Sequence, residues 1–311
     1  MRMSVVALAV AGSMVVGPAL AWAGNDIYFV TYNHHVEKGE TELMVMNDFT
    51  EPAERSEEEK LGGYFSNMLE LEYGVTEQFA TEVMLEGFED VTHSYGKFTG
   101  FRWENRYRLL KDKNWFLNPM LYMEYEDLDP KTRFKMEVSG REDGKGEPPE
   151  EDQRERIMET RLVLSRDVGR LNVAFNWINE TDMRRSGFTD FGYALGLRYS
   201  LSDHHHEDED EDDEHPADHS ASHLAHHGRH GLPAGQPTLA GRWKPAAIGV
   251  ELFGGLGNSR AFGGPFEMQP HYLSPILMFH PSEHVMIHVG AAFGLTGVSD
   301  DLIRTGIALE F

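Results

Sequence analysis

Hydrophobic and polar residues alternate strictly over the last ten positions of the chain, from Leu302 to Phe311. Side chains of a β-strand point to opposite faces in turn, so this pattern predicts a strand with one apolar face and one more polar face. The apolar face carries Ile303, Thr305, Ile307, Leu309 and Phe311, and the other face carries Arg304, Gly306, Ala308 and Glu310. An outward apolar row backed by an inward polar row is typical of a strand in a transmembrane barrel.

The same alternation recurs along the chain and predicts twelve strands, an even number as a closed bacterial barrel requires. The expected strands lie near residues 41–48, 64–75, 79–90, 98–110, 115–127, 155–165, 170–180, 189–201, 243–256, 269–280, 284–296 and 302–311. The expected fold is therefore all-β, a closed antiparallel transmembrane β-barrel of about twelve strands. Another strand-like run, Ile27 to Tyr32, leaves three alternatives open for its segment: a plug, a periplasmic arm or an extra hairpin that would make fourteen strands.

Short and long connections alternate between the expected strands. The short connections are residues 76–78, 111–114, 165–169 and 281–283, and the longer ones include residues 127–154 and 181–189. Bacterial barrels have short periplasmic turns and longer outer loops. A chain that ends in the periplasm places all four short turns there, which agrees with that rule.

Rows of apolar side chains at every second position indicate contact with lipid. They are Leu69, Leu71, Tyr73 and Val75; Phe101, Trp103, Tyr107 and Leu109; and Leu171, Val173, Phe175 and Trp177. Aromatic residues near strand ends, Trp115, Tyr125, Tyr199, Trp243 and Tyr272, are expected in interfacial girdles. A soluble β-sandwich or lipocalin-like barrel also alternates, but the rows opposite these carry too many charges for a dry core.

Those charged rows are the candidate lining of the lumen: Glu70, Glu72, Glu82, Glu86, Arg102, Glu104, Arg106, Arg108 and Glu124. Pairing neighbouring strands across their turns is expected to set Glu86 and Glu124 opposite Arg102, and Glu82 opposite Arg106. Two interpretations stay open. The charges can form a transverse field that orients solutes in a pore, or an ion-pair ladder that braces a barrel without conduction.

The opposite wall is expected to be poor in side-chain bulk. Its inward positions are Gly192, Ala194 and Gly196; Gly290, Ala292 and Gly294; and Gly306 and Ala308. Small residues there leave space beside the charged wall. That space can serve as a path for solute, or it can hold a plug or an inward-folded loop.

The amino terminus has the form of a secretory signal. An apolar run from Val5 to Val16 is followed by Gly-Pro and by Ala21-Trp22-Ala23, a small-x-small cleavage site. A retained membrane helix needs about 20 apolar residues, and this run is broken sooner. We therefore expect a signal peptide at residues 1–23, an arm or plug at 24–40, and an outer-membrane barrel at 41–311 that is interrupted by an insert at 202–240.

The insert is rich in histidine and carboxylates, and eight consecutive carboxylates run from Glu207 to Glu214. It cannot build a core, so we expect it to be disordered or weakly helical. Its histidines are candidate ligands for Zn(II), Ni(II), Cu(II) or Co(II). They are His204, His205, His206, His215, His219, His223, His226, His227 and His230. Strand parity places the insert in the periplasm. The alternative to a physiological metal role is adventitious metal binding by a solvated polyhistidine tract.

Composition excludes several other classes. The 311-residue chain has no cysteine, which excludes disulfides, thiolate metal sites and a lipid-anchoring cysteine. Its net charge of −24 argues against a nucleic-acid partner. The sequence has no Gly-x-Ser-x-Gly and no His-Glu-x-x-His, and histidines such as His34, His35 and His288 have no recognisable catalytic partner, so we expect the protein not to be an enzyme.

Two resemblances add to this picture. The terminal Phe311, with apolar residues at alternate positions before it, resembles the signal that barrel assembly machinery recognises in Gram-negative bacteria. The stretch Leu69 to Phe79, Leu-Glu-Leu-Glu-Tyr-Gly-Val-Thr-Glu-Gln-Phe, resembles hairpins in uncharacterised outer-membrane proteins grouped with the MetA-pathway phenol-degradation family. That resemblance covers one hairpin and implies transport rather than catalysis.

The sequence as a whole predicts a channel or transporter-like barrel in the outer membrane of a Gram-negative bacterium, with a divalent-metal-binding periplasmic insert. Its expected partners are outer-membrane lipid, the barrel assembly machinery, and a small solute or metal ion. Two alternatives remain: a closed structural or metal-sequestering barrel without conduction, and an outer-membrane enzyme.

Overall fold

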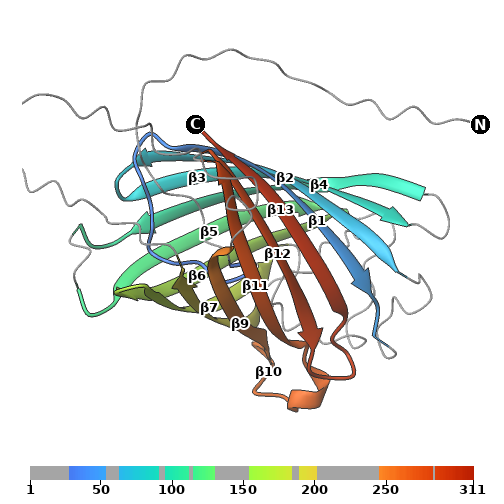
Figure 1. Cartoon of the computed structure of the whole chain (residues 1–311). Coiled ribbons are helices and arrows are strands. Elements are labelled where there is room, and N and C mark those ends of the chain that lie inside the picture. Colours follow the sequence, from blue (N-terminus) through green and yellow to red (C-terminus); the bar gives the residue numbers. More distant parts are fainter. Residues whose placement is uncertain are drawn as a thin grey trace, which may run out of the picture.

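The strands of this protein wrap into a closed antiparallel barrel (Figure 1). The computed structural model describes residues 28–53, 63–90, 95–111, 115–129, 154–183, 189–201, 245–282 and 284–311. The barrel strands are β1 (Thr41–Glu51), β2 (Tyr64–Thr76), β3 (Phe79–Asp90), β4 (Tyr95–Arg108), β5 (Asn118–Leu128), β6 (Glu155–Val168), β7 (Leu171–Asp182), β8 (Thr189–Ser200), β9 (Pro245–Asn258), β11 (His271–Ser282), β12 (Val285–Gly294) and β13 (Asp301–Glu310).

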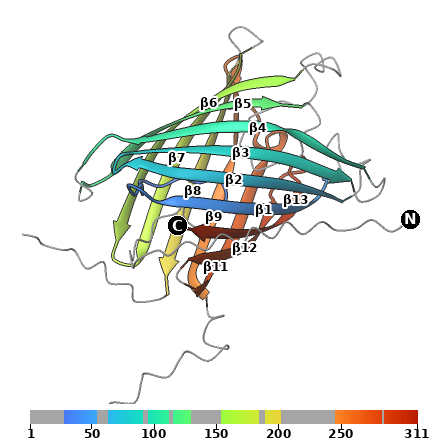
Figure 2. The same ribbon diagram turned by 90° about the horizontal axis from the view of Figure 1, so that it is seen from above.

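Closure joins the two ends of the chain. β13 pairs with β1 in antiparallel register, with Glu310 opposite Glu42 and Gly306 opposite Met46. β8 pairs with β9 across the long interruption, so the described strands form an unbroken ring (Figure 2). A two-residue strand, β10 (Ala261–Phe262), pairs only with the end of β9, and a short 3₁₀ turn (Phe266–Met268) follows it. The predicted fold class of a closed barrel of twelve strands is confirmed.

Burial follows the period-two pattern that predicted the strands. Along β2, Leu69 and Leu71 are exposed on the outer face, whereas Met68 and Glu70, which alternate with them, are buried. In this barrel the apolar side chains lie outside and the charged side chains lie inside, which is the reverse of a soluble protein. This arrangement is stable only where lipid surrounds the protein. The protein is therefore an outer-membrane β-barrel. Within the described residues, no helix is long and apolar enough to cross a membrane.

One girdle assignment was wrong. Tyr272 is buried and stacks on Phe253, with ring centroids 5.0 Å apart. It shares the inward face of β11 with Ser274 and Ile276, while Leu273 and Leu277 point outward. The alternation of β11 therefore decides the direction of Tyr272, although the residue lies near a strand end as the girdle residues do.

The short turns gather at one end of the barrel. Residues 77–78 join β2 to β3, and residues 169–170 join β6 to β7. Strand direction places the start of β1, the end of β13 and the residues that flank the 202–244 interruption at this same end. We call it the periplasmic end, since short turns are periplasmic in bacterial barrels.

Residues 28–40 form no strand and lie largely inside the ring, where the blue trace enters it in Figure 1. Tyr28, Val30, Asn33 and His34 are buried against the inner wall. The fourteen-strand alternative is therefore excluded for the part of the chain that the structure describes. We call residues 28–40 the luminal segment. The expected signal peptide and the insert at 202–240 lie outside the described residues.

Candidate luminal site

The charged wall expected from sequence lies on the inner face of β2 to β5. Arg102 of β4 forms an ion pair with Glu86 of β3. Its guanidinium also lies 3.2 Å from a Glu124 carboxylate oxygen and 3.3 Å from one of Glu126, both on β5. All four side chains are buried. The Arg102 guanidinium therefore links β3, β4 and β5 on the luminal face.

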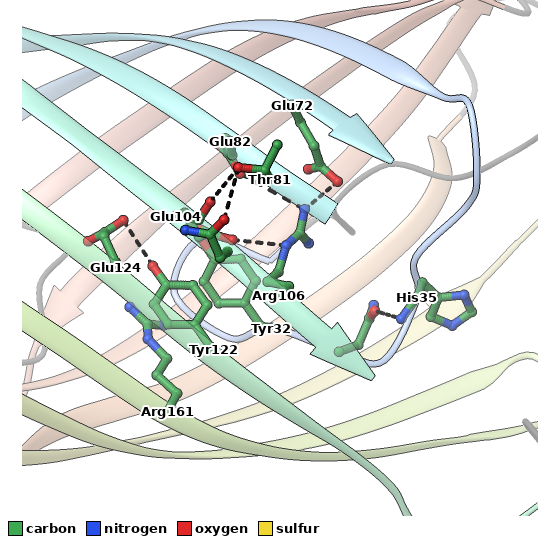
Figure 3. A network of polar contacts seen from close by, with 12 residues as sticks. Tyr32, His35, Glu72, Thr81, Glu82, Glu104, Arg106, Tyr122, Glu124 and Arg161 are labelled. Carbon is green, nitrogen blue, oxygen red and sulfur yellow. Dashed lines mark hydrogen bonds and ion pairs between the residues drawn. The ribbon is translucent and has the colours of Figure 1, made fainter. Parts of the chain in front are cut away.

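A second cluster surrounds Arg106, two inward positions beyond Arg102 along β4 and nearer the periplasmic end (Figure 3). Arg106 pairs with Glu72 of β2, and its Nε lies 2.9 Å from a Glu104 carboxylate oxygen. Glu82 is 4.0 Å from the same guanidinium. The Tyr32 hydroxyl of the luminal segment donates a 2.7 Å hydrogen bond to Glu104. Burial and the nearby Glu104 raise the pKa of Tyr32 well above its usual value, so this hydroxyl keeps its proton and acts as the donor.

The strand registers differ from the expected ones by two residues. Arg102 lies opposite Met84 and Glu126, and Glu82 lies opposite Glu104. A one-residue register shift between Glu86 and Gly87 interrupts the pairing of β3 with β4. The long arginine side chains nevertheless reach diagonally to Glu86 and Glu124, so those expected partners meet Arg102 without lying directly opposite it.

The remaining candidate lumen residues point inward as well. Glu70 is buried beside an interior cavity, and Glu72 is nearly buried. Arg108 is buried at the periplasmic end, where its guanidinium donates a 2.7 Å hydrogen bond to the Glu77 carbonyl of the turn. The two clusters hold the other six residues, so all nine candidates lie on the inner face. The nine candidate metal-ligating histidines of the insert lie outside the described residues.

Glu251 of β9 anchors the luminal segment from the opposite wall. Its carboxylate accepts hydrogen bonds from three consecutive backbone amides, of Phe29 at 2.8 Å, Val30 at 3.0 Å and Thr31 at 2.7 Å. Backbone amides that face a buried wall need partners, and a carboxylate with several lone pairs can satisfy three of them at once. This arrangement replaces the strand pairing that the luminal segment lacks.

Asn176 and Arg161 also bind the backbone of the luminal segment, at Tyr32 and at Val30. The Asn176 amide of β7 accepts from the Tyr32 backbone amide at 2.7 Å and donates to the Tyr32 carbonyl at 2.8 Å, as a neighbouring strand would. Arg161 of β6 donates to the Val30 carbonyl at 2.6 Å. The same guanidinium lies 4.9 Å from the Tyr32 ring centre and 4.7 Å from that of Tyr122, which is a favourable cation–π geometry.

The wall of small residues accommodates the aromatic side chains of the luminal segment. A Cβ atom at Gly196 would lie 2.6 Å from the Tyr28 ring, and one at Gly290 would lie 2.4 Å from the Phe29 ring. Phe29 also lies under the Arg304 guanidinium, which forms two 2.6 Å hydrogen bonds with Asp48. The space that the sequence predicted beside the charged wall is thus filled here by residues 28 and 29 rather than left open.

A cavity of about 70 Å³ remains between the luminal segment and the wall. Its apolar part is lined by Met44, Met46, Met68 and Met84 from β1 to β3, and its polar part includes Glu70 and Arg102. Methionine is flexible and fills irregular space around a segment without regular structure. The barrel interior therefore combines a charged wall, a methionine-rich wall and a tethered segment.

Several of these residues were missed from sequence. Glu251 and Asn176 lie at inward positions of strands that the sequence predicted. The alternation of residues along these strands therefore indicated that both side chains face the lumen. Nothing in the pattern signalled that both would bind the luminal segment, because that contact joins positions more than 140 residues apart in the chain. His34 and His35 had no visible partner in sequence, and the structure places Asp167 beside them.

No protein-family model matches the chain, and no curated protein does. Several solved outer-membrane barrels resemble it in structure. The KdgM porin in complex with disordered oligogalacturonate aligns with a TM-score of 0.49 and 8% identity, over 87% of this chain and 99% of that one. An outer membrane channel from Pseudomonas putida F1 aligns with a TM-score of 0.49 and 10% identity, over 89% and 98%. At such identities the likeness concerns the fold alone.

The comparisons correct one expectation. Outer membrane phospholipase A from Escherichia coli aligns with a TM-score of 0.39 and 9% identity, over 90% of this chain and 93% of its own. Since the similar barrels include one named as a phospholipase, the expectation that the chain is not an enzyme does not stand. The two missing sequence motifs exclude only the catalytic arrangements that they encode.

Proposed function

We propose that the protein is a gated outer-membrane channel for small polar or charged solutes, closed in this state by the luminal segment. The observation that carries the proposal is the way this segment is held. Side chains of β6, β7 and β9 bind its backbone, and no strand pairing fixes it. A segment held by side-chain contacts and not by strand pairing can leave the lumen without breaking the ring of strands.

The charged wall supplies the polarity that such a channel needs. Arg102 and Arg106 alternate with carboxylates on the inner face, so a solute passing along the wall meets both signs of charge within a short distance. Rings and rows of charged side chains set the selectivity of pores. The wall therefore supports passage of polar or charged molecules over apolar ones.

Conductance of the refolded full-length protein in planar bilayers tests the gate. The test variant is Glu251→Ala with Asn176→Ala, which removes both sets of hydrogen bonds to the backbone of the luminal segment. The control is Glu267→Ala, which removes an exposed carboxylate from the 3₁₀ turn outside the lumen. We expect low conductance for the wild type and the control, and a several-fold higher open probability for the test variant.

The outcomes separate the channel from the alternative of a closed structural barrel. A test variant that assembles, as judged by heat-modifiable mobility in gels, but conducts no better than the control would contradict gating by the luminal segment. An absence of conductance in every variant, including one that lacks residues 28–38, would favour a barrel braced by its charged wall.

We also propose that the insert at 202–240 binds divalent transition metal in the periplasm. Its nine histidines supply imidazole ligands, and its carboxylates concentrate cations near them. Support for the location comes from β8 and β9, whose facing ends bear the insert at the periplasmic end of the barrel. Outer-membrane lipid and the barrel assembly machinery are the remaining proposed partners.

A further inference from the structure

Two adjacent histidines of the luminal segment lie against a carboxylate of the barrel wall. His35 Nε2 lies 2.9 Å from Asp167 Oδ2, and His34 Nε2 lies 3.6 Å from the same oxygen. One ligand atom from each of the three residues falls within 4.8 Å of the others. His34 is buried, His35 is partly buried, and Asp167 sits next to the last residue of β6, beside the periplasmic turn.

Neighbouring side chains orient these groups. His34 Nδ1 is hydrogen-bonded to the Ser165 hydroxyl at 2.6 Å, which leaves Nε2 toward Asp167. The Asn172 amide of β7 donates to Asp167 Oδ1 at 2.6 Å, so Oδ2 is the oxygen that faces the histidines. Metal-binding histidines and carboxylates are usually held in this manner by hydrogen bonds to their other atoms. The cluster has the three donors and the outer contacts of a built site.

We propose that His34, His35 and Asp167 form a binding site for a divalent transition metal of the Zn(II) type, which fastens the luminal segment to β6. Zinc ligands lie about 2.0–2.2 Å from the metal in tetrahedral sites, so neighbouring donor atoms are separated by about 3.4 Å. The 3.6 Å separation matches that spacing, and the 2.9 Å pair needs only a small outward shift. Two neutral imidazoles and one carboxylate suit a borderline divalent ion and leave a fourth position for water.

Metal at this site would add a coordination link between the luminal segment and β6, which already share hydrogen bonds and the cation–π contact of Arg161 with Tyr32. Because the luminal segment contributes two ligands and the wall contributes the third, the ion binds the closed arrangement and not one in which the segment has left. A ligand that binds only one of two states shifts the equilibrium toward it. The inference rests on the proposed gate, and it makes periplasmic metal the signal that keeps the gate closed.

Hydrogen–deuterium exchange of the full-length refolded barrel tests the site directly. Zn(II) should slow exchange of the backbone amides of residues 29–36 by at least about tenfold in the wild type. To separate this site from the insert, the comparison is repeated in a full-length protein whose nine insert histidines are all changed to Gln, and the protection should persist there. His284→Gln, which alters an exposed histidine of the turn between β11 and β12, is the matched control.

His35→Gln and Asp167→Asn should each abolish the zinc-dependent protection. His35 belongs to the luminal segment, so its replacement cannot prevent the strands from pairing, and it keeps the test interpretable if Asp167→Asn fails to assemble. Equal protection in His35→Gln and the wild type would overturn the proposal, as would loss of protection in the protein whose insert histidines are replaced. Zinc protection without any conductance would leave the metal site standing and reject only the channel.

Discussion

The buried arginines of the charged wall each lie among several carboxylates. Arg102 is within 3.3 Å of carboxylate oxygens on two strands, and Arg106 contacts carboxylates on β2 and β4. Removing one partner of a buried ion pair is costly, about 3–5 kcal/mol, because the remaining charge is left uncompensated. These arginines therefore affect both the stability of the barrel and the field inside it.

Changing Arg102 and Arg106 to Ala separates these two roles. In the Glu251→Ala, Asn176→Ala background, where the luminal segment is released, we expect reversal potentials to shift toward cation selectivity, since positive charge leaves an acidic conduit. If the charged wall only stabilises the barrel, the same change lowers the temperature of the heat-modifiable transition and does not alter the reversal potential. Lys97→Ala, which removes a cation paired with Asp129 at the outer end of β4, is the control.

At the scale of elements, the inner face of β8 and the luminal segment are complementary in shape. A Cβ at Gly196 would meet only atoms of Tyr28 and Thr31 among its closest contacts, so a larger side chain there would displace the segment and not the neighbouring strands. Glycine at position 196 therefore leaves the space that the luminal segment occupies.

We expect Gly196→Leu to raise channel open probability several-fold and to speed amide exchange in residues 29–32. Gly87→Leu is the matched control, because a Cβ at that position meets only the Lys97 carbonyl at an ordinary 3.5 Å. Conductance and exchange should be measured on the same refolded preparations. Unchanged exchange in Gly196→Leu would show that the segment is not held against β8.

The closing pair of strands carries the last residue of the chain. The Phe311 amide donates to the Thr41 carbonyl at 2.9 Å, while its ring is exposed on the outer face. Deleting Phe311 removes that bond and the aromatic end that resembles an assembly signal. We expect the amount of protein assembled in the outer membrane to fall several-fold, measured by heat-modifiable mobility of membrane fractions. Phe311→Tyr, which keeps an aromatic ring, should assemble normally, and equal yields for all three proteins would reject the signal.

At the scale of the whole molecule, barrel closure does not require the insert. β8 and β9 pair directly from Ser200 opposite Ala247 to the outer end, with the insert attached beyond that register. The ring and the insert are therefore separable in principle, and their proposed roles can be tested apart.

We expect deletion of residues 203–230 to leave heat-modifiable folding intact and to abolish high-capacity binding of Zn(II) or Ni(II), measured by equilibrium dialysis. In the intact protein, affinity should fall as the pH drops through the unperturbed histidine pKa of about 6.5, because ligand imidazoles must be neutral. Undiminished capacity after the deletion would remove the assigned role. Protease added to intact cells should spare the insert, and cleavage there from outside would reverse its topology.

The alternation of residues determined the strands, their inward and outward faces, and the closure of the last strand on the first. The strands and their faces depend on residues that are close together in the sequence. The closure follows from the rule that every edge of a sheet must be paired in lipid. A single sequence is therefore enough to infer all three features. The nine luminal charges could be identified in this way, because burial in a barrel follows strand parity.

Only the tertiary structure decided what fills the barrel. The contacts of Glu251 with residues 29–31, of Gly196 with Tyr28, and of Asp167 with His34 and His35 join distant parts of the chain and follow no periodicity. The exact register of β3 and β4 was also decided there, since one shift near Gly87 moves every later pairing. Whether the space beside the charged wall is open or occupied depends on such packing, and packing is a property of the folded molecule.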